Sequence, residues 1–190
     1  MNRFPQVSRL ALSAAGLLLV AVTATAQTAQ PAPAAPTAAT QTRIHQADQT
    51  FITDGTKTVS TQHDAARIAD SRTSDSQVKA FAQRVSTDDA KIIQAMRAAS
   101  PRGVDVPAND PDTTVLDSIK TLRGAEFDKA YIEQVALAGQ QKTISAFQAE
   151  IASGRDTKLK EVARQSLPIL QAHYAEAQKL AQRHHLASAQ

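Results

Sequence analysis

The chain contains no cysteine and no tryptophan, and aromatic residues make up only 4% of its 190 residues. Without cysteine, the protein has neither a disulfide framework nor a thiolate for catalysis or metal binding. Glycine is also scarce, with six residues in all, and no glycine-rich phosphate-binding loop occurs. No strand-like alternation of apolar and polar residues competes with helical periodicity. The stability of the fold must therefore come from burying a mostly aliphatic helical core.

A concentrated positive charge is also missing. The formal net charge is +3, but Arg3 and Arg9 belong to the N-terminal segment, and without them 19 basic residues face 18 acidic ones. The remaining lysines and arginines form no cluster that could neutralise a row of phosphates. The sequence therefore disfavours nucleic acid as a partner.

Residues 1–26 have the pattern of a cleavable secretory signal peptide. Arg3 and Arg9 supply the positive end, residues 10–22 are apolar, and Ala24-Thr25-Ala26 is a small-x-small cleavage site. An uncleaved membrane anchor is the alternative, but the apolar run is shorter than the roughly 20 residues that cross a bilayer. We expect a periplasmic or secreted protein with no transmembrane segment after cleavage. Residues 27–43, rich in Ala, Pro and Thr, are expected to form a disordered tether.

Residues 44–187 are predicted to fold as one helical domain. Apolar residues recur at helical spacing over 44–70, 75–99, 125–153 and 159–186, and over a short segment at 113–122. Short connections make the first and last pairs antiparallel hairpins, and residues 101–112 form a long crossing between them. The prediction is an all-α, ferritin-like four-helix bundle with one long crossover that carries a short extra helix.

The periodicity also predicts local details of the bundle. We expect a capping box from Ser74 and Gln77, an N-terminal cap from Asp156, an irregularity near Gly139, and a kink caused by Pro168 near Gln165. The predicted core consists of Phe81, Val85, Ile92, Phe127, Tyr131, Ile144, Leu159, Leu167, Leu170 and Tyr174.

Four stretches of the chain resemble a known family. They are VKAFAQRV (78–85), GAEFDKAYIE (124–133), SGRDTKLKEVA (153–163) and LPILQAHYAEAQKL (167–180). Their order and spacing resemble the domain of unknown function 4142 family, which consists of exported bacterial proteins, over about residues 51–180. The resemblance implies a ferritin-like helical bundle and an exported, periplasmic location. It implies no established activity.

The chain departs from the family at its polar positions. Many relatives carry Asp-Asp-His in the second long helix and Glu-His after the Leu-Pro of the fourth, where this chain has Thr87-Asp88-Asp89 and Ala172-His173. Gln62 and Asp64 stand where relatives often have a Glu pair. No Glu-x-x-His occurs, so the sequence disfavours a ferritin-like di-metal centre.

The candidate polar cluster consists of His173, Asp89, Asp88 and His63. Adjacent aspartates point about 100° apart on a helix, so Asp88 and Asp89 are not expected to share a proton. We expect His173 to face the bundle interior, with Asp89 across from it as its carboxylate partner. The simplest role for such a pair is structural. A metal site is not expected, but its ligands would be His173, Asp89 and His63.

No catalytic constellation occurs in the sequence: there is no Ser-His-Asp order and no His-Glu-x-x-His zinc helix. We therefore expect no enzymatic activity and no cofactor. The function predicted is that of a non-enzymatic binding or interaction module of the cell envelope, with an unidentified protein or small molecule as its partner. The alternative is a ferritin-like metal-binding protein with a degenerate site, as in a metal-dependent oxidase.

Overall fold

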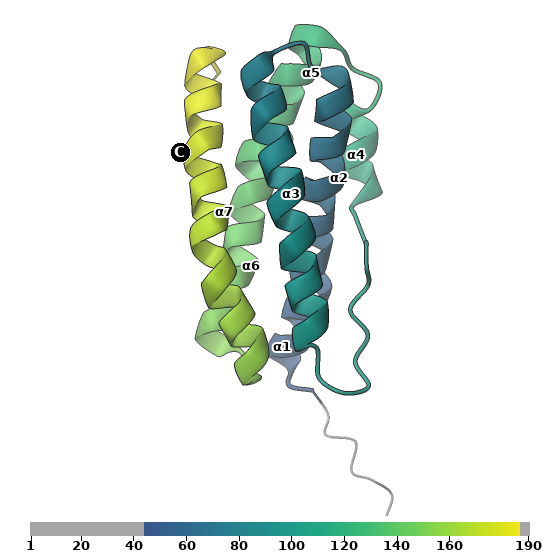
Figure 1. Ribbon diagram of the computed structural model, residues 1–190, viewed down its shortest axis with the longest axis vertical. Coiled ribbons are helices and arrows are strands. Elements are labelled where there is room, and N and C mark those ends of the chain that lie inside the picture. Colours follow the sequence, from purple (N-terminus) through teal and green to yellow (C-terminus); the bar gives the residue numbers. More distant parts are fainter. Residues whose placement is uncertain (1–43, 187–190) are drawn as a thin grey trace, which may run out of the picture. The chain divides into compact units, whose positions relative to one another are not determined.

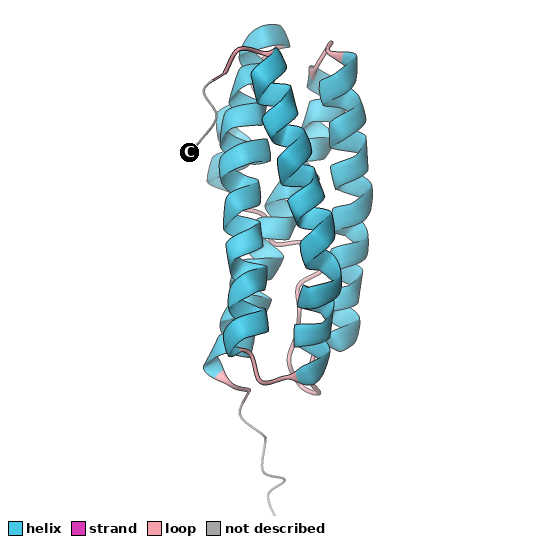
Figure 2. Ribbon diagram, turned by 90° about the vertical axis from the view of Figure 1, so that its left-hand side faces the viewer, coloured by secondary structure: helices cyan, strands magenta, loops and turns pink. Residues whose placement is uncertain are grey.

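Four long helical segments dominate the structure, a computed structural model that describes residues 44–186 (Figure 1). The signal peptide and tether predicted for residues 1–43 lie outside this range. The described residues contain helices and loops and no strand (Figure 2), which confirms the all-α prediction. The elements are α1 (Gln46–Thr50), η1 (Phe51–Gly55), α2 (Thr56–Arg72), α3 (Ser76–Ala99), α4 (Thr113–Ile119), α5 (Gly124–Ala130), η2 (Tyr131–Gly139), α6 (Gln140–Ser153) and α7 (Thr157–Arg183).

The long segments run side by side in two hairpins. The first hairpin joins α1-η1-α2 to α3 through residues 73–75, and the second joins α5-η2-α6 to α7 through residues 154–156. Across the hairpins, α3 packs on α7 and α2 packs on η2. Residues 100–112 run back along the outside of α2 to α4 (Figure 1), as the predicted crossing requires.

Aspartates cap three of the helices. The Asp156 carboxylate accepts hydrogen bonds from the backbone N–H groups of Lys158 and Leu159 at the start of α7, as predicted. The predicted capping box at Ser74 is wrong by one residue, because Asp75 is the cap of α3 and accepts from Gln77 N at 2.7 Å and Val78 N at 3.0 Å. A carboxylate at this place also complements the positive end of the helix dipole.

The core consists of two apolar clusters stacked along the bundle. One surrounds Phe81, Phe127 and Tyr131, and the other surrounds Phe51, Phe147 and Leu159. Eight of the ten predicted core residues are buried, whereas Leu167 and Tyr174 are partly buried at the edge. Helical periodicity places a residue on a face but does not fix where that face meets solvent.

Two π-helical segments interrupt the α-helical hydrogen bonding. η2 ends at Gly139, which confirms the irregularity expected there, and η1 ends at Gly55. Each lets the side chains after it change face without a break in the helix. Pro168 lies inside α7, which continues through it from Thr157 to Arg183.

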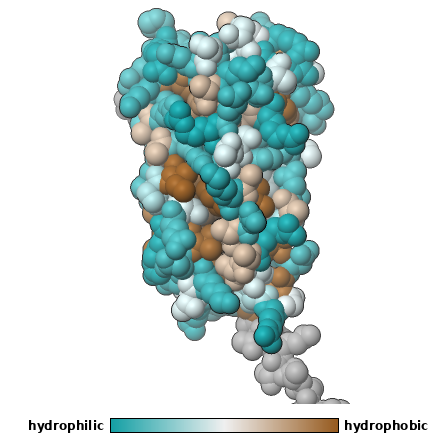
Figure 3. Space-filling model, viewed as in Figure 1, coloured by the Kyte–Doolittle hydropathy of each residue, from teal (hydrophilic) through white to brown (hydrophobic). Residues whose placement is uncertain are grey.

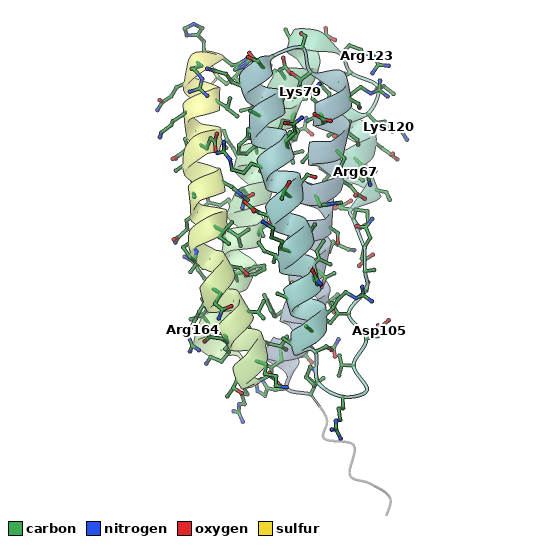
Figure 4. The ribbon with its side chains drawn as sticks, viewed as in Figure 1. Arg67, Lys79, Asp105, Lys120, Arg123 and Arg164 are labelled. Atoms are coloured by element: carbon green, nitrogen blue, oxygen red, sulfur yellow. The ribbon has the colours of Figure 1, made fainter. Side chains whose placement is uncertain are left out.

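The outer surface is polar. In Figure 4 the charged side chains of Lys120, Arg123 and Arg164 point away from the bundle, and Figure 3 shows hydrophobic atoms mainly in the seam between α3 and α7. Among the described residues, Ile169 is the large hydrophobic side chain that stays exposed. No helix in this part of the chain combines the length and the apolar character that a membrane crossing needs.

The crossing is fastened to α2 by three hydrogen bonds. Asp110 N donates to Ser60 Oγ at 3.1 Å, Asp112 N donates to Thr61 Oγ1 at 2.8 Å, and Asn109 Nδ2 donates to Asp64 Oδ2 at 2.8 Å. Val106 is buried in the core cluster that surrounds Phe51, Phe147 and Leu159. The crossing is therefore part of the packed structure.

Candidate functional site

Each of the four long segments contributes a buried polar side chain to the interior. Since helix interiors satisfy their own backbone, such side chains need partners of their own. Among these side chains are Gln62 from α2, Asp89 from α3, Tyr131 and Gln140 from the third segment, and His173 from α7. Two of them bond to backbone carbonyls of a neighbouring segment: Gln62 Nε2 donates to Val135 O at 2.9 Å and Gln140 Nε2 to Leu170 O at 3.2 Å.

His173 faces the interior, as predicted, but its partner is not the predicted one. Its Nε2 lies 3.2 Å from Asp88 Oδ2, and the prediction of Asp89 is wrong. Adjacent residues on α3 point about 100° apart, so Asp88 is turned toward α7 while Asp89 is turned into the core. Burial lowers the pKa of His173, and the hydrogen bond to Asp88 opposes that shift. The result is a paired, structural histidine at the edge of the core.

Asp89 has no hydrogen-bond partner for either carboxylate oxygen among the described residues. Burial raises its pKa well above the ordinary value, and the charge of Asp88 adds to the shift. Burial also raises the pKa of the Tyr131 hydroxyl, with a further contribution from Asp89. A neutral carboxyl group in an apolar interior is the outcome that this environment favours.

His63 does not join this group. Its Nδ1 lies 3.0 Å from Asp64 Oδ1, and it lines a hollow of about 480 Å³ between α2, α3 and the crossing, together with Arg67 and Arg97. Of the four predicted site residues, His173 and Asp88 thus form a pair, Asp89 is an isolated buried acid, and His63 lies on another face. No three His, Cys, Asp or Glu side chains in residues 44–186 converge so that they could hold a metal ion. The donor set does not fit a ferritin-like metal centre.

Two further buried acids, Asp48 and Glu150, lie at the end of the bundle where α6 connects to α7, and the sequence patterns did not predict them. Asp48 Oδ1 accepts from Arg155 N at 2.7 Å and Asp156 N at 2.9 Å. Glu150 is 1% exposed, and its carboxyl group lies so close to Gly154 that a Cβ there would overlap it. Burial raises the pKa of Glu150 to about 7, and the nearby charge of Asp48 adds to the shift.

One signal for the burial of Glu150 was present in the sequence. Glu150 follows Thr143 and Phe147 on the same helical face, and both of those residues are buried. A charged residue in line with a core stripe indicates a buried acid. Its partner Asp48 lies about one hundred positions earlier in the chain, and no local pattern connects the two.

A groove lies on another face, between η1-α2 and η2-α6. Its volume is about 770 Å³, and its lining is mainly apolar, with Leu137, Ala138 and Ala146 as its floor. Lys57 and Lys142 stand on its two walls, one on each segment. Neither lysine forms a salt bridge within residues 44–186. Both amines are therefore available to a ligand.

The groove continues into a smaller hollow of about 100 Å³, which Lys57, Thr58 and Lys142 also line. Gln62 and Gly139 lie on the wall of this inner hollow. A Cβ on Gly139 would lie 2.5 Å from Gln62 Nε2, so this glycine provides the room that the Gln62 amide occupies. No sequence pattern predicts the groove, because its residues belong to segments about 80 positions apart.

The groove and the inner hollow have the features of a binding site. Ligand sites are mostly apolar clefts of about 300–1,000 Å³ with a few polar groups that fix orientation. Within the described part of the chain, the groove and the inner hollow contain no histidine or cysteine. Two acids line them, Asp54 in the groove and Asp112 in the hollow, where Asp112 caps α4.

Comparison with protein families gave one match. Residues 33–180 match a family model described as "Domain of unknown function (DUF4142)". This range includes both the buried polar residues and the groove. Neither a comparison with curated proteins nor one with solved structures gave a match.

Proposed function

Because the chain belongs to the DUF4142 family, whose description assigns no activity, we propose a function from the geometry: a non-enzymatic binding protein of the cell envelope that holds a small molecule between α2 and η2-α6. The observation that carries this proposal is the pair of lysines, Lys57 and Lys142, above an apolar floor. Two cationic groups without partners beside an apolar surface suit a ligand that has both an anionic and an apolar part.

The proposal includes a ferritin-like bundle. Its support is the order of the elements, since a single long connection, residues 100–112 with α4, lies between the second and third long segments. That connectivity is typical of ferritin-like folds. In this chain the bundle serves as a rigid support for a surface groove, because the interior polar residues of the described part of the chain form no group that could hold a metal ion.

The proposal also includes export. The positive, apolar and small-x-small order of residues 1–26 supports it. We expect the mature protein to begin near Gln27 and to be found in the periplasmic or secreted fraction. Mass spectrometry of the exported protein tests this, and an intact Met1–Ala26 segment on it would contradict the proposal.

Ligand binding is tested by thermal unfolding of the mature protein with a set of small organic acids, amines and neutral compounds. A ligand that binds only the folded state raises the melting temperature in proportion to its occupancy. We expect some acids to stabilise the wild type but not a Lys57→Gln, Lys142→Gln double variant. Lys179→Gln, on the exposed side of α7 away from the groove, is the matched control.

Two outcomes would contradict the proposal. One is that no compound of the set stabilises the protein, or that stabilisation is the same in the double variant. The other is stoichiometric metal in protein purified without a His tag, accompanied by loss of that metal in His173→Ala. The second outcome would favour the metal-binding alternative.

A further inference from the structure

We propose that the groove binds a small organic acid whose carboxylate lies between Lys57 and Lys142 and whose hydroxyl group, at the other end of an apolar body, donates to Gln62 in the inner hollow. This inference rests on the proposed function, since it names the ligand class of the same groove. Three observations carry it: the placement of the two lysines, the apolar floor and the free acceptor on Gln62.

The lysines define the place of the carboxylate. Lys57 and Lys142 are the charged residues that line both the groove and the inner hollow, so both lysines lie where the two meet. Each comes from a different segment, and a carboxylate between them would receive charge-assisted hydrogen bonds from both walls. Asp54 lines only the outer groove, and Asp112, whose Oδ1 accepts from the N–H of Thr114, lines only the inner hollow.

The floor defines the body of the ligand. Val115 and Val135 line the inner hollow together with Gln62 and the two lysines, and Leu137, Ala138 and Ala146 extend this apolar lining outward into the groove. A ring or a short branched chain would bury apolar surface there. A sugar or a phosphate would have its polar groups desolvated without partners.

Gln62 defines the far end of the ligand. Its Nε2 donates to Val135 O at 2.9 Å, and because a carbonyl can only accept, this bond fixes which end of the amide faces the backbone. The hydrogen bonds of the described residues include none to its Oε1, although the residue is 3% exposed and lines the hollow. A neutral hydroxyl satisfies this acceptor. An ammonium group would have to give up its water beside a side chain that is 3% exposed, which is costlier.

Gly139 keeps the acceptor in place. Its backbone has an ordinary helical φ of −64°, so the glycine is not needed for its conformation. It is needed for space, since a Cβ would lie 2.5 Å from Gln62 Nε2. Gly139→Ala therefore displaces the Gln62 amide and leaves both lysines unchanged.

Three probes separate the two ends of the ligand. 4-Hydroxybenzoate has both groups, benzoate lacks the hydroxyl, and 4-hydroxybenzyl alcohol lacks the carboxylate. Isothermal titration calorimetry of the mature wild type should give the tightest binding for 4-hydroxybenzoate. Loss of the hydroxyl should weaken binding about 3–10-fold, the size of one neutral hydrogen bond. Loss of the carboxylate should weaken it about 10–100-fold.

Variants assign each end to its residues. The double variant Lys57→Gln, Lys142→Gln should bring the affinity for 4-hydroxybenzoate down to that of the neutral alcohol. Gly139→Ala and Gln62→Leu should each reduce the preference for 4-hydroxybenzoate over benzoate to about one while keeping the preference for acids. Lys179→Gln should change neither preference. Because Gln62→Leu can also weaken the fold, Gly139→Ala is the deciding variant and each variant is first checked by thermal unfolding.

The outcomes that overturn the inference differ from those that overturn the proposed function. Equal binding of benzoate and 4-hydroxybenzoate removes the hydroxyl contact to Gln62. Equal binding of the neutral alcohol and 4-hydroxybenzoate would rule out a contact between the carboxylate and the lysines, although the groove would still bind a small molecule. If none of the three probes binds, the inference fails. The function then fails with it only if the wider compound set also leaves the unfolding temperature unchanged.

Discussion

Asp48 and Asp89 are equally hidden from water, with exposed fractions of 2% and 0%, yet their surroundings are opposite. Asp48 lies at the end of the bundle and receives two backbone N–H groups from the connection between α6 and α7. Asp89 lies on α3 in the middle of the bundle, and no described group donates to it. One position supplies two backbone hydrogen bonds to the carboxyl group, and the other supplies none and favours a neutral carboxyl group.

The difference follows from where free backbone donors exist. The middle of a helix has no unused N–H groups, whereas the first turn of a helix and the residues before it do. A buried aspartate at a helix junction therefore finds donors in the chain itself, and one in mid-bundle finds only side chains. A buried aspartate of the first kind links two segments through hydrogen bonds. One of the second kind is favoured in its neutral form.

The largest expected effect comes from removing the satisfied acid. Asp48→Ala leaves the N–H groups of Arg155 and Asp156 without their acceptor, and we expect the free energy of unfolding to fall by about 2–4 kcal/mol. Urea denaturation measures it. Asp105→Ala, at an exposed position of the crossing, is the control and should stay within about 0.5 kcal/mol. A loss below that size for Asp48→Ala would mean that the two bonds contribute little.

The acid beside Asp48 should make stability depend on pH. The pKa of Glu150 is raised from 4.5 to about 7 in the folded state, so the fold binds this proton more tightly than the unfolded chain does. Its contribution is complete below about pH 4.5 and is lost as the pH rises toward about 7, by on the order of 1–3 kcal/mol.

Urea denaturation at several pH values should show this decline in the wild type, and it should be smaller in Glu150→Gln. The raised pKa of Asp89 acts in the same direction, so only the difference between the two proteins belongs to Glu150. Identical pH profiles for both would contradict the assignment.

The next effect concerns His173, which has fewer hydrogen bonds than Asp48 and more than Asp89. One ring nitrogen is bonded to Asp88 and the other has no partner among the described residues. We expect His173→Ala to destabilise the fold by about 1–3 kcal/mol. A double-mutant cycle with Asp88→Ala should give a coupling of about 0.5–1.5 kcal/mol. A coupling indistinguishable from zero would show that the two side chains lie close together without stabilising each other.

The smallest effect is expected from Asp89→Asn. Asparagine has nearly the same shape as a protonated aspartate, so at mildly acidic pH the free energy of unfolding should change by less than about 1 kcal/mol. As the pH rises the wild type must ionise Asp89 or hold its proton, and the variant should become the more stable of the two. The same substitution at Asp48 should cost more at every pH. Equal losses at both positions would remove the distinction between the two acids.

Much of the fold could be predicted because helical periodicity and caps act locally. The stripe of α7, the Asp156 cap, the irregularity before Gln140 and the long crossing all follow from spacing alone. The cap of α3 was missed by one residue, because Ser74 and Asp75 are both good caps and only tertiary packing chooses between them.

The site was harder to predict because it depends on which helix faces which. The sequence placed His173 in the interior, but whether Asp88 or Asp89 meets it depends on a rotation of α3 by one residue. Lys57 and Lys142 carry no local pattern at all, since exposed lysines are ordinary on helices. Only the packing of α2 on η2-α6 brings them to one groove.

The hydrogen bonds that fasten the crossing to α2 have a consequence for proteolysis. A protease must first lift an extended stretch away from the surface, and in residues 101–112 that would break the bonds to Ser60, Thr61 and Asp64 and expose Val106. The rate of nicking within residues 101–112 therefore measures how often the crossing lifts away from α2.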